Sequence, residues 1–176
     1  MLNLLPNPKY CKTQIDIRVD IRSGKVIKTN YNKVNNFADD SFDCIVIFEN
    51  NPSAFYLVLL NNPNSKFYIP EIPEMIRNQN EGYLLEIDNE YTVILSLTEC
   101  GLFYGWQTYL QLLQQEIDYY TLVIDFPDNN FRGFHMDLRY GMPNFDRMIQ
   151  IIDRLALYKF NKFILEYENR FQFKNT

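Results

Sequence analysis

The sequence predicts an α/β protein in two parts: a small α+β sandwich domain, with an antiparallel or mixed sheet plus helices, and then the first β-α-β unit of a truncated β/α barrel. Three observations favour this class. Short apolar runs suited to strands occupy residues 14–98, helical periodicity follows at 99–116, and residues 131–167 show a strand, helix, strand pattern. Because such a barrel normally needs about 250 residues, we expect the 176 residues to hold only its start.

The first part contains several strand signals. Residues 14–21 alternate apolar and polar, and Ser23-Gly24 predicts a hairpin turn toward residues 25–28. Residues 42–48 and 54–60 are apolar runs of strand length, which suit two strands or a short helix and one strand. The runs 82–88 and 91–98 flank Asn89-Glu90 and predict a second hairpin.

A helix is predicted from Glu99 to about Glu116, because apolar side chains recur there at spacings of three and four. This stripe is expected to pack against the sheet. Gly101 and Gly105 lie one turn apart near its start, which predicts a close approach between the helix backbone and a neighbouring element.

A domain boundary is predicted near residues 120–128, where a short strand ends at Pro127 and an Asp-Asn-Asn turn follows. We assign residues 1–122 to the amino-terminal domain and residues 123–176 to the start of the barrel, truncated after its second strand. Pro143 and Asn144 predict the start of the barrel helix. Residues 160–167 then supply a strand parallel to the first.

Composition excludes several classes of function. A net charge of −5 and a pI of about 4.9 argue against nucleic-acid partners. No apolar run approaches the roughly 20 residues that cross a bilayer, so no membrane partner is expected. The first residues lack the basic flank and length of a signal peptide, which predicts a cytoplasmic location unless a leader precedes them.

No metal or cofactor is indicated by the residues. Cys11, Cys44 and Cys100 are widely spaced and His135 is the one histidine, which makes a zinc site improbable. No glycine loop suited to phosphate is present. Because His135 falls within a strand signal, a packed or hydrogen-bonded histidine is favoured over a general base.

Three segments in chain order resemble the family 20 glycoside hydrolases, the β-N-acetylhexosaminidases. They are residues 4–9, residues 82–87 with 101–113, and residues 128–173. The middle segment also resembles O-GlcNAc hydrolases and α-glucuronidases, but the strand that runs from Arg132-Gly133 to Asp137 favours family 20. The Glu166-Tyr-Glu168 ending is similar to the hexosaminidase D branch.

The resemblance implies an N-acetylhexosamine substrate and retaining hydrolysis assisted by the substrate's own acetamido group. The catalytic Asp-Glu pair of the family follows the fourth barrel strand, so no catalytic residue is expected in this segment. Arg132 matches the family's sugar-binding arginine. Glu166 and Glu168 share one face of a strand and are expected to take part in that site. The competing interpretations are an arginine paired with Asp137 or Glu166, and an exposed acidic pair.

Two other functions stay open at this point. The chain could be complete and act as a non-catalytic carbohydrate-binding or interaction module. Alternatively, it could be the front part of a related glycosidase of the O-GlcNAc hydrolase or α-glucuronidase type. Because the other barrel units are missing from this segment, its open edge predicts self-association, or packing on the leading domain through the helix of residues 145–158.

Overall fold

The computed structural model describes residues 2–20, 26–29, 45–47, 54–60, 66–139, 141 and 143–167, with the backbone alone at 26–29, 45–47 and 60. The chain divides into two compact units, Met1–Asp128 and Asn129–Thr176. The division expected from the sequence, after residue 122, falls inside β7 (Tyr119–Asp125). That strand belongs to the sheet of the first unit.

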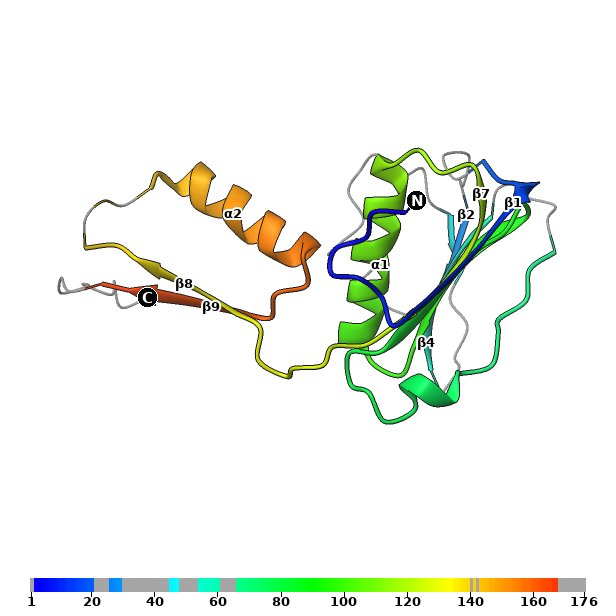
Figure 1. Cartoon of the computed structure of the whole chain (residues 1–176), viewed down its shortest axis with the longest axis horizontal. Helices are drawn as coiled ribbons and strands as arrows, with labels where there is room; N and C mark the ends of the chain where they lie inside the picture. Colours follow the sequence, from blue (N-terminus) through cyan, green and yellow to red (C-terminus); the bar gives the residue numbers. More distant parts are fainter. Residues whose placement is uncertain are drawn as a thin grey trace. The chain divides into compact units, whose positions relative to one another are not determined.

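A mixed sheet forms the first unit, in the order β1-β7-β5-β6-β4-β2-β3 (Figure 1). Neighbouring strands are antiparallel except for β2 and β3, which are parallel. The α+β class is therefore confirmed. The strands besides β7 are β1 (Tyr10–Arg18), β2 (Val26–Thr29), β3 (Ile45–Ile47), β4 (Phe55–Leu60), β5 (Tyr83–Ile87) and β6 (Tyr91–Ser96).

The predicted hairpin between residues 14–21 and 25–28 is wrong. β1 pairs with β7, whereas β2 pairs with β3 and β4. Strands that are consecutive in the chain are neighbours in only about two-thirds of cases, and here β1 pairs with a strand distant in sequence, β7. The register also shifts between Gln14 and Arg18, and Ile15 is 67% exposed, so the expected apolar face is broken. The turn residues 21–25 lie outside the described residues.

The predicted hairpin of residues 82–88 and 91–98 is confirmed as β5 and β6, closed by the Asp88 N–H donating to the Tyr91 carbonyl at 2.8 Å. The predicted helix is α1 (Glu99–Gln114). The Thr98 hydroxyl accepts from the Gly101 N–H and caps its start. Figure 1 shows α1 over one face of the sheet.

Apolar side chains cover both faces of the sheet. On the α1 face, Trp106 and Leu102 of the helix pack with Leu85 and Ile94 of the strands. On the other face, three apolar residues of the irregular segment before the short 3-10 helix η2 (Glu74–Ile76) pack against a second cluster. They are Phe67, Ile69 and Ile72. The sheet is therefore the middle layer of the unit.

The close approach predicted at Gly101 and Gly105 is confirmed. A Cβ atom on Gly101 would lie 2.1 Å from Ser96 Oγ and 2.3 Å from the Gly82 carbonyl oxygen. On Gly105 it would lie 2.4 Å from the Ile94 Cγ2 methyl. All three distances are far shorter than any real contact of a Cβ atom. The absence of side chains is therefore what allows α1 to lie directly on β5 and β6.

Two glutamines, Gln111 of α1 and Gln115 at its C-cap, hold the first residues of the chain by their backbone. The Gln111 amide accepts from the Leu5 N–H at 2.9 Å and donates to the Leu5 carbonyl at 2.7 Å. Gln115, one turn later, makes the same pair of bonds with Asn3 at 2.8 and 3.1 Å. Between them Leu4 is buried in the core. Residues 3–5 are thus held by paired hydrogen bonds to their backbone N–H and carbonyl groups.

Replacing Gln111 with alanine is expected to lower the unfolding free energy by about 1–3 kcal/mol, because two hydrogen bonds to a partly buried backbone are lost. Gln114→Ala is the matched control, since Gln114 is exposed on the same turn. Urea unfolding followed by circular dichroism measures both changes. Equal effects of the two substitutions would contradict the role of the Leu5 contacts.

A buried polar network joins the helix to the sheet. The Tyr83 hydroxyl lies 2.6 Å from Thr108 Oγ1 and donates to Asp125 Oδ2 at 3.2 Å. The other Asp125 oxygen accepts from the Lys9 N–H at 3.2 Å. Burial, followed by the neighbouring Asp125 charge, raises the pKa of Tyr83 well above its usual value. The folded state therefore strongly favours the neutral phenol.

We expect stability to fall at alkaline pH, and Tyr83→Phe to reduce that dependence. Unfolded tyrosine releases its proton near pH 10, whereas folded Tyr83 keeps it, so the unfolded state binds fewer protons above that pH. The unfolding free energy then drops by about 1.4 kcal/mol per pH unit for this one group. Urea unfolding at pH 9 to 11 measures the slope. Burial also raises the pKa of Tyr91, to about 12, but this residue is present in both the unchanged protein and Tyr83→Phe. If the unfolding free energies of the two proteins fall with pH at the same slope, the prediction is contradicted.

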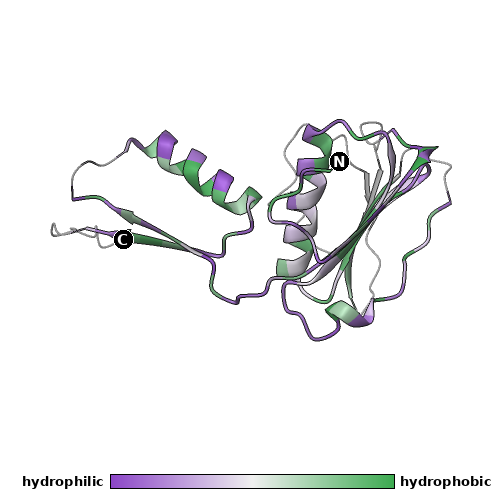
Figure 2. Cartoon of the chain, in the orientation of Figure 1, coloured by the Kyte–Doolittle hydropathy of each residue, from purple (hydrophilic) through white to green (hydrophobic). Residues whose placement is uncertain are grey.

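The second unit consists of β8 (Gly133–Asp137), α2 (Phe145–Leu157) and β9 (Lys162–Glu166), with β8 and β9 parallel, as predicted. The Asn144 side chain caps α2 by accepting from the Arg147 N–H at 2.9 Å. The rings of Phe134 and Phe163 stack across the two strands, with 6.1 Å between their centroids. Figure 2 shows α2 with one apolar and one polar side, although none of its described residues is buried.

Candidate functional site

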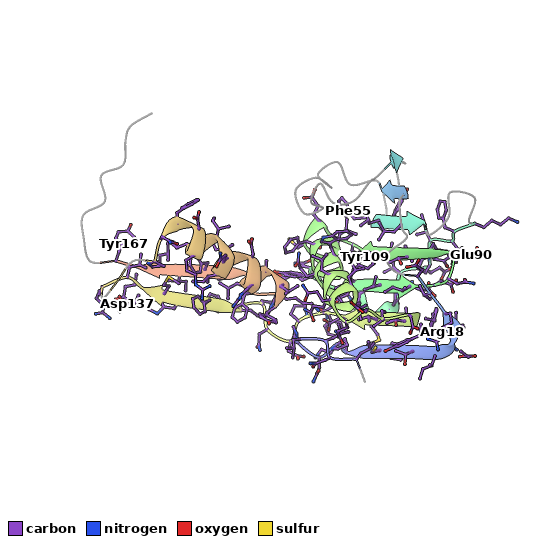
Figure 3. The ribbon with its side chains drawn as sticks, turned by 90° about the horizontal axis from the view of Figure 1, so that it is seen from above. Arg18, Phe55, Glu90, Tyr109, Asp137 and Tyr167 are labelled. Atoms are coloured by element: carbon purple, nitrogen blue, oxygen red, sulfur yellow. The ribbon has the colours of Figure 1, made fainter. Side chains whose placement is uncertain are left out.

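Charged side chains gather at the carboxyl ends of β8 and β9. Asp137 ends β8, Glu166 ends β9, and the two residues are paired in register. The Leu138 N–H donates to the Glu166 carbonyl at 2.9 Å and keeps the ends together. Figure 3 labels Asp137 and Tyr167 at this same end of the strand pair. We call the four residues His135, Asp137, Arg139 and Glu166 the strand-end cluster.

Glu166 contacts both basic residues of the strand-end cluster. Its Oε2 atom lies 2.9 Å from His135 Nε2, and its Oε1 atom lies 3.8 Å from Arg139 Nη2. The second distance is an ion pair but too long for a hydrogen bond. The Glu166 side chain is 42% exposed and that of His135 is 53% exposed. Solvent screens pairs this exposed, so they contribute little to stability.

Asp137 holds Arg139 more tightly. The Arg139 N–H donates to Asp137 Oδ1 at 2.9 Å, and its Nε donates to Oδ2 at 2.7 Å. These hydrogen bonds to Arg139 lower the pKa of Asp137 below its ordinary value. The guanidinium is thereby fixed next to Glu166, with a defined direction for its donors.

Arg132 lies at the opposite end of the strands, directly before β8. Its Nε donates to the Lys159 carbonyl and its Nη1 to the Asn129 carbonyl, each at 2.8 Å. Its backbone N–H donates to Asn161 Oδ1 at 2.9 Å. In this conformation, the guanidinium ties together the two segments that lead into β8 and β9.

Among the predicted site residues that the structure describes, Arg132 and Glu166 lie at opposite ends of the strands. Arg132 precedes Asp137 by five residues, a backbone separation of about 16 Å in an extended strand, and Glu166 is level with Asp137. The predicted carboxylate partners of Arg132 instead contact His135 and Arg139. Glu168 lies outside the described residues.

Sequence reasoning missed His135 and Arg139 as members of this cluster. His135 lies two residues before Asp137, so both share one face of β8, and this alternation was the available signal. Arg139 follows the end of the strand, where no periodicity predicts the direction of a side chain. Within the ranges that the structure describes, no three His, Cys, Asp or Glu side chains are placed to hold a metal ion. None of the described helices is long and apolar enough to span a membrane.

The family-model match to known proteins falls in the first unit. Residues 60–127 match the model of glycosyl hydrolase family 20, domain 2. A β-hexosaminidase of Porphyromonas gingivalis is 31% identical over 96 residues, which are 48% of this chain and 12% of that protein. A β-hexosaminidase of Vibrio vulnificus is 30% identical over 84 residues, or 47% and 10% of the two chains. The matches thus span about a tenth of these curated relatives.

Solved structures share the fold over a longer range. The chitobiase of Flavobacterium johnsoniae aligns with 93% of this chain and 27% of its own, at a TM-score of 0.62 and 21% identity. A family 20 β-N-acetylhexosaminidase of Streptomyces coelicolor aligns with 92% and 34%, at a TM-score of 0.62 and 20% identity. Residues 60–127, which include β5, β6, α1 and β7, are thus similar to domain 2 of glycosyl hydrolase family 20, and the curated relatives that the chain matches are β-hexosaminidases.

Proposed function

We propose that this chain is the amino-terminal part of a β-N-acetylhexosaminidase, which removes terminal N-acetylglucosamine or N-acetylgalactosamine by retaining hydrolysis assisted by the substrate's acetamido group. The match of residues 60–127 to domain 2 of family 20 carries this proposal. Two curated relatives with that name, at 30% and 31% identity, support it. The general acid and its partner would come from sequence beyond these 176 residues.

We further propose that the second unit begins a (β/α)8 barrel. Its strand, helix and parallel strand are the repeating unit of that fold, and its charged residues lie at the carboxyl ends of the strands, where barrel enzymes place their sites. The structural likeness covers more of the chain than the first unit alone supplies. Several apolar side chains of this unit are exposed, as expected if further barrel segments cover them. They include Phe145, Ile149, Ile152, Ile164 and Leu165.

Sugar binding is proposed for Glu166 at the carboxyl end of β9, for Glu168 two residues later in the sequence, and for Arg132 by its match to the family's arginine. Carboxylates accept hydrogen bonds from hydroxyls, and a guanidinium donates several in one plane. The contacts of Arg132 with two backbone carbonyls also suit a structural role, so its part in binding needs a separate test.

The experiment is to purify the endogenous polypeptide, measure its intact mass by mass spectrometry and assay its hydrolysis of aryl N-acetyl-β-hexosaminides. We expect a mass well above 21.1 kDa, release of the aryl group, and no release by the 176-residue chain alone. A mass of 21.1 kDa without hydrolysis would overturn the proposal. In that case, a non-catalytic carbohydrate-binding module becomes the better interpretation.

A further inference from the structure

The strand β1 forms one edge of the sheet of the first unit. It is the first strand in the sheet order and pairs with β7 on one side, and no other strand that the structure describes pairs with its second side. Figure 3 shows β1, with Arg18 at its end, along the border of the sheet. The backbone N–H and C=O groups along such an edge can pair with a further strand.

The second half of β1 is separated from its neighbour. The register shifts between Gln14 and Arg18, so residues 15–17 have no register partner in β7. Bulges often protect an edge strand by twisting it away from a partner. β1 nevertheless stays a strand over Tyr10–Arg18, and Ile15 is 67% exposed. A further strand would therefore cover this apolar side chain, which is favourable.

The charges of β1 are arranged so that two copies of the strand attract each other. Charged side chains usually protect an edge, because identical strands then repel each other. Lys12 and Asp16 have opposite charges and lie two residues before and two residues after Gln14. If two copies pair antiparallel with Gln14 opposite Gln14, each Lys12 lies opposite the partner's Asp16. Opposite charges directly across an antiparallel pair are stabilising, and the two-fold symmetry gives two such pairs.

The charges also select this register over its neighbours. If the two-fold axis passed through Lys12 instead, the two lysines would lie opposite each other, and an axis through Asp16 would do the same to the two carboxylates. Like charges directly opposite are destabilising. With the axis at Gln14, the other positions are compatible, since Thr13 lies opposite the partner's Ile15.

Lys12 and Asp16 are available for this pairing. Both side chains are exposed, and neither has an ion-pair partner within the part of the chain that the structure describes. Arg18, the other charged residue of β1 beyond Gln14, pairs with Asp118 of its own chain. Its charge is therefore balanced, and the charge pattern of the edge is set by Lys12 and Asp16.

We propose that β1 is an interface between two copies of this chain, in which the two strands pair antiparallel about Gln14 and Lys12 of each copy pairs with Asp16 of the other. Such an interface is closed by its two-fold axis, because each copy uses its β1 edge once, and association stops at the dimer. One strand from each copy is a small interface, so the dimer is weak and reversible. The pairing concerns the first unit alone and is independent of the proposed hydrolysis.

The test is a dilution series of the 176-residue chain, measured by sedimentation equilibrium and by ¹H–¹⁵N NMR. We expect a monomer–dimer equilibrium, and backbone N–H signals of residues 11–17 that shift with protein concentration. Absence of a dimer up to about 1 mM protein, the range of the weakest specific complexes, would overturn the proposal. A dimer that leaves the signals of residues 11–17 unchanged would overturn it as well.

Charge reversal tests the pairing itself. Lys12→Glu turns both attractive contacts of the dimer into repulsive ones, and so does Asp16→Lys, so each variant alone should raise the dimer Kd by about 10-fold or more. Mixed in equal amounts, the two variants should form a heterodimer with a Kd near that of the unchanged protein, because every cross-strand pair then joins opposite charges. This recovery would also show that both variants are folded.

Two further variants control for the change in net charge. Lys66→Glu and Glu71→Lys make the same changes at exposed positions outside β1 and should dimerise as the unchanged protein does. If they weaken the dimer as much as the β1 variants, net charge rather than strand pairing is responsible and the proposal is wrong. It is also wrong if Lys12→Glu dimerises normally, as expected for a dimer held by the exposed apolar side chains of the second unit, or if mixing the β1 variants restores nothing.

Discussion

Gly101→Ala is expected to lower the unfolding free energy by about 3 kcal/mol, at the upper end of the usual cost of overpacking. The new Cβ would meet Ser96 Oγ at 2.1 Å and the Gly82 carbonyl at 2.3 Å. Neither neighbour can move easily, because the Ser96 hydroxyl donates to that carbonyl at 2.6 Å. Alanine favours a helix over glycine by about 1 kcal/mol, which is too little to offset the clash.

Two other glycines provide the comparison. At Gly105 the Cβ would make one contact below 3.0 Å, with the Ile94 Cγ2 methyl at 2.4 Å, whereas at Gly101 it would make two, one of them with a backbone carbonyl. At Gly141, no atom of the residues that the structure describes lies within 4 Å of the Cβ position, its chain neighbours aside. The expected order of destabilisation is therefore Gly101, then Gly105, with Gly141→Ala within about 0.5 kcal/mol of the unchanged protein. Urea unfolding measures all three, and a neutral Gly101→Ala would show that α1 does not lie so close to β5 and β6.

The close approach of α1 to the sheet at Gly101 is an example of what the sequence could predict. The helix α1, the β5–β6 hairpin and the strands of the second unit follow from periodicity and turn residues within each segment. The pairing of β1 with β7 joins segments about a hundred residues apart, so no local pattern specifies it. The turn signal Ser23-Gly24 therefore predicted a pairing of β1 with β2, which do not pair in the sheet.

The candidate site shows the same limit. The sequence placed Glu166 at the end of a strand, and the structure has it as the last residue of β9. It did not show that Arg132 would lie at the amino end and bond to the Lys159 and Asn129 carbonyls. Those contacts depend on where two loops meet in space. Arg139 went unnoticed for the same reason, since its position follows from the Asp137 carboxylate that it contacts.

Arg132→Ala should reduce kcat/KM of the proposed hexosaminidase by about 10²- to 10³-fold if its guanidinium contacts the sugar, since two charged hydrogen bonds are lost. The two carbonyl contacts predict a second effect, a loss of about 1–3 kcal/mol in unfolding free energy. Activity must therefore be expressed per folded molecule, with circular dichroism and urea unfolding measured on the same samples. Arg147→Ala is the control, because Arg147 lies exposed on α2 and its guanidinium donates to Gln150 Oε1 of the same helix.

Arg132→Lys separates the two roles of this residue. A lysine keeps the positive charge but lacks the planar fork that reaches two acceptors at once. If Arg132 only ties the Lys159 and Asn129 carbonyls, stability falls in both variants while kcat/KM per folded molecule stays near that of the unchanged enzyme. If Arg132 also binds the sugar, kcat/KM per folded molecule falls in both variants. Because Arg132 lies at the amino end of β8, the second outcome would place sugar binding away from Glu166, at the end of the strand opposite to the one where barrel enzymes have their sites.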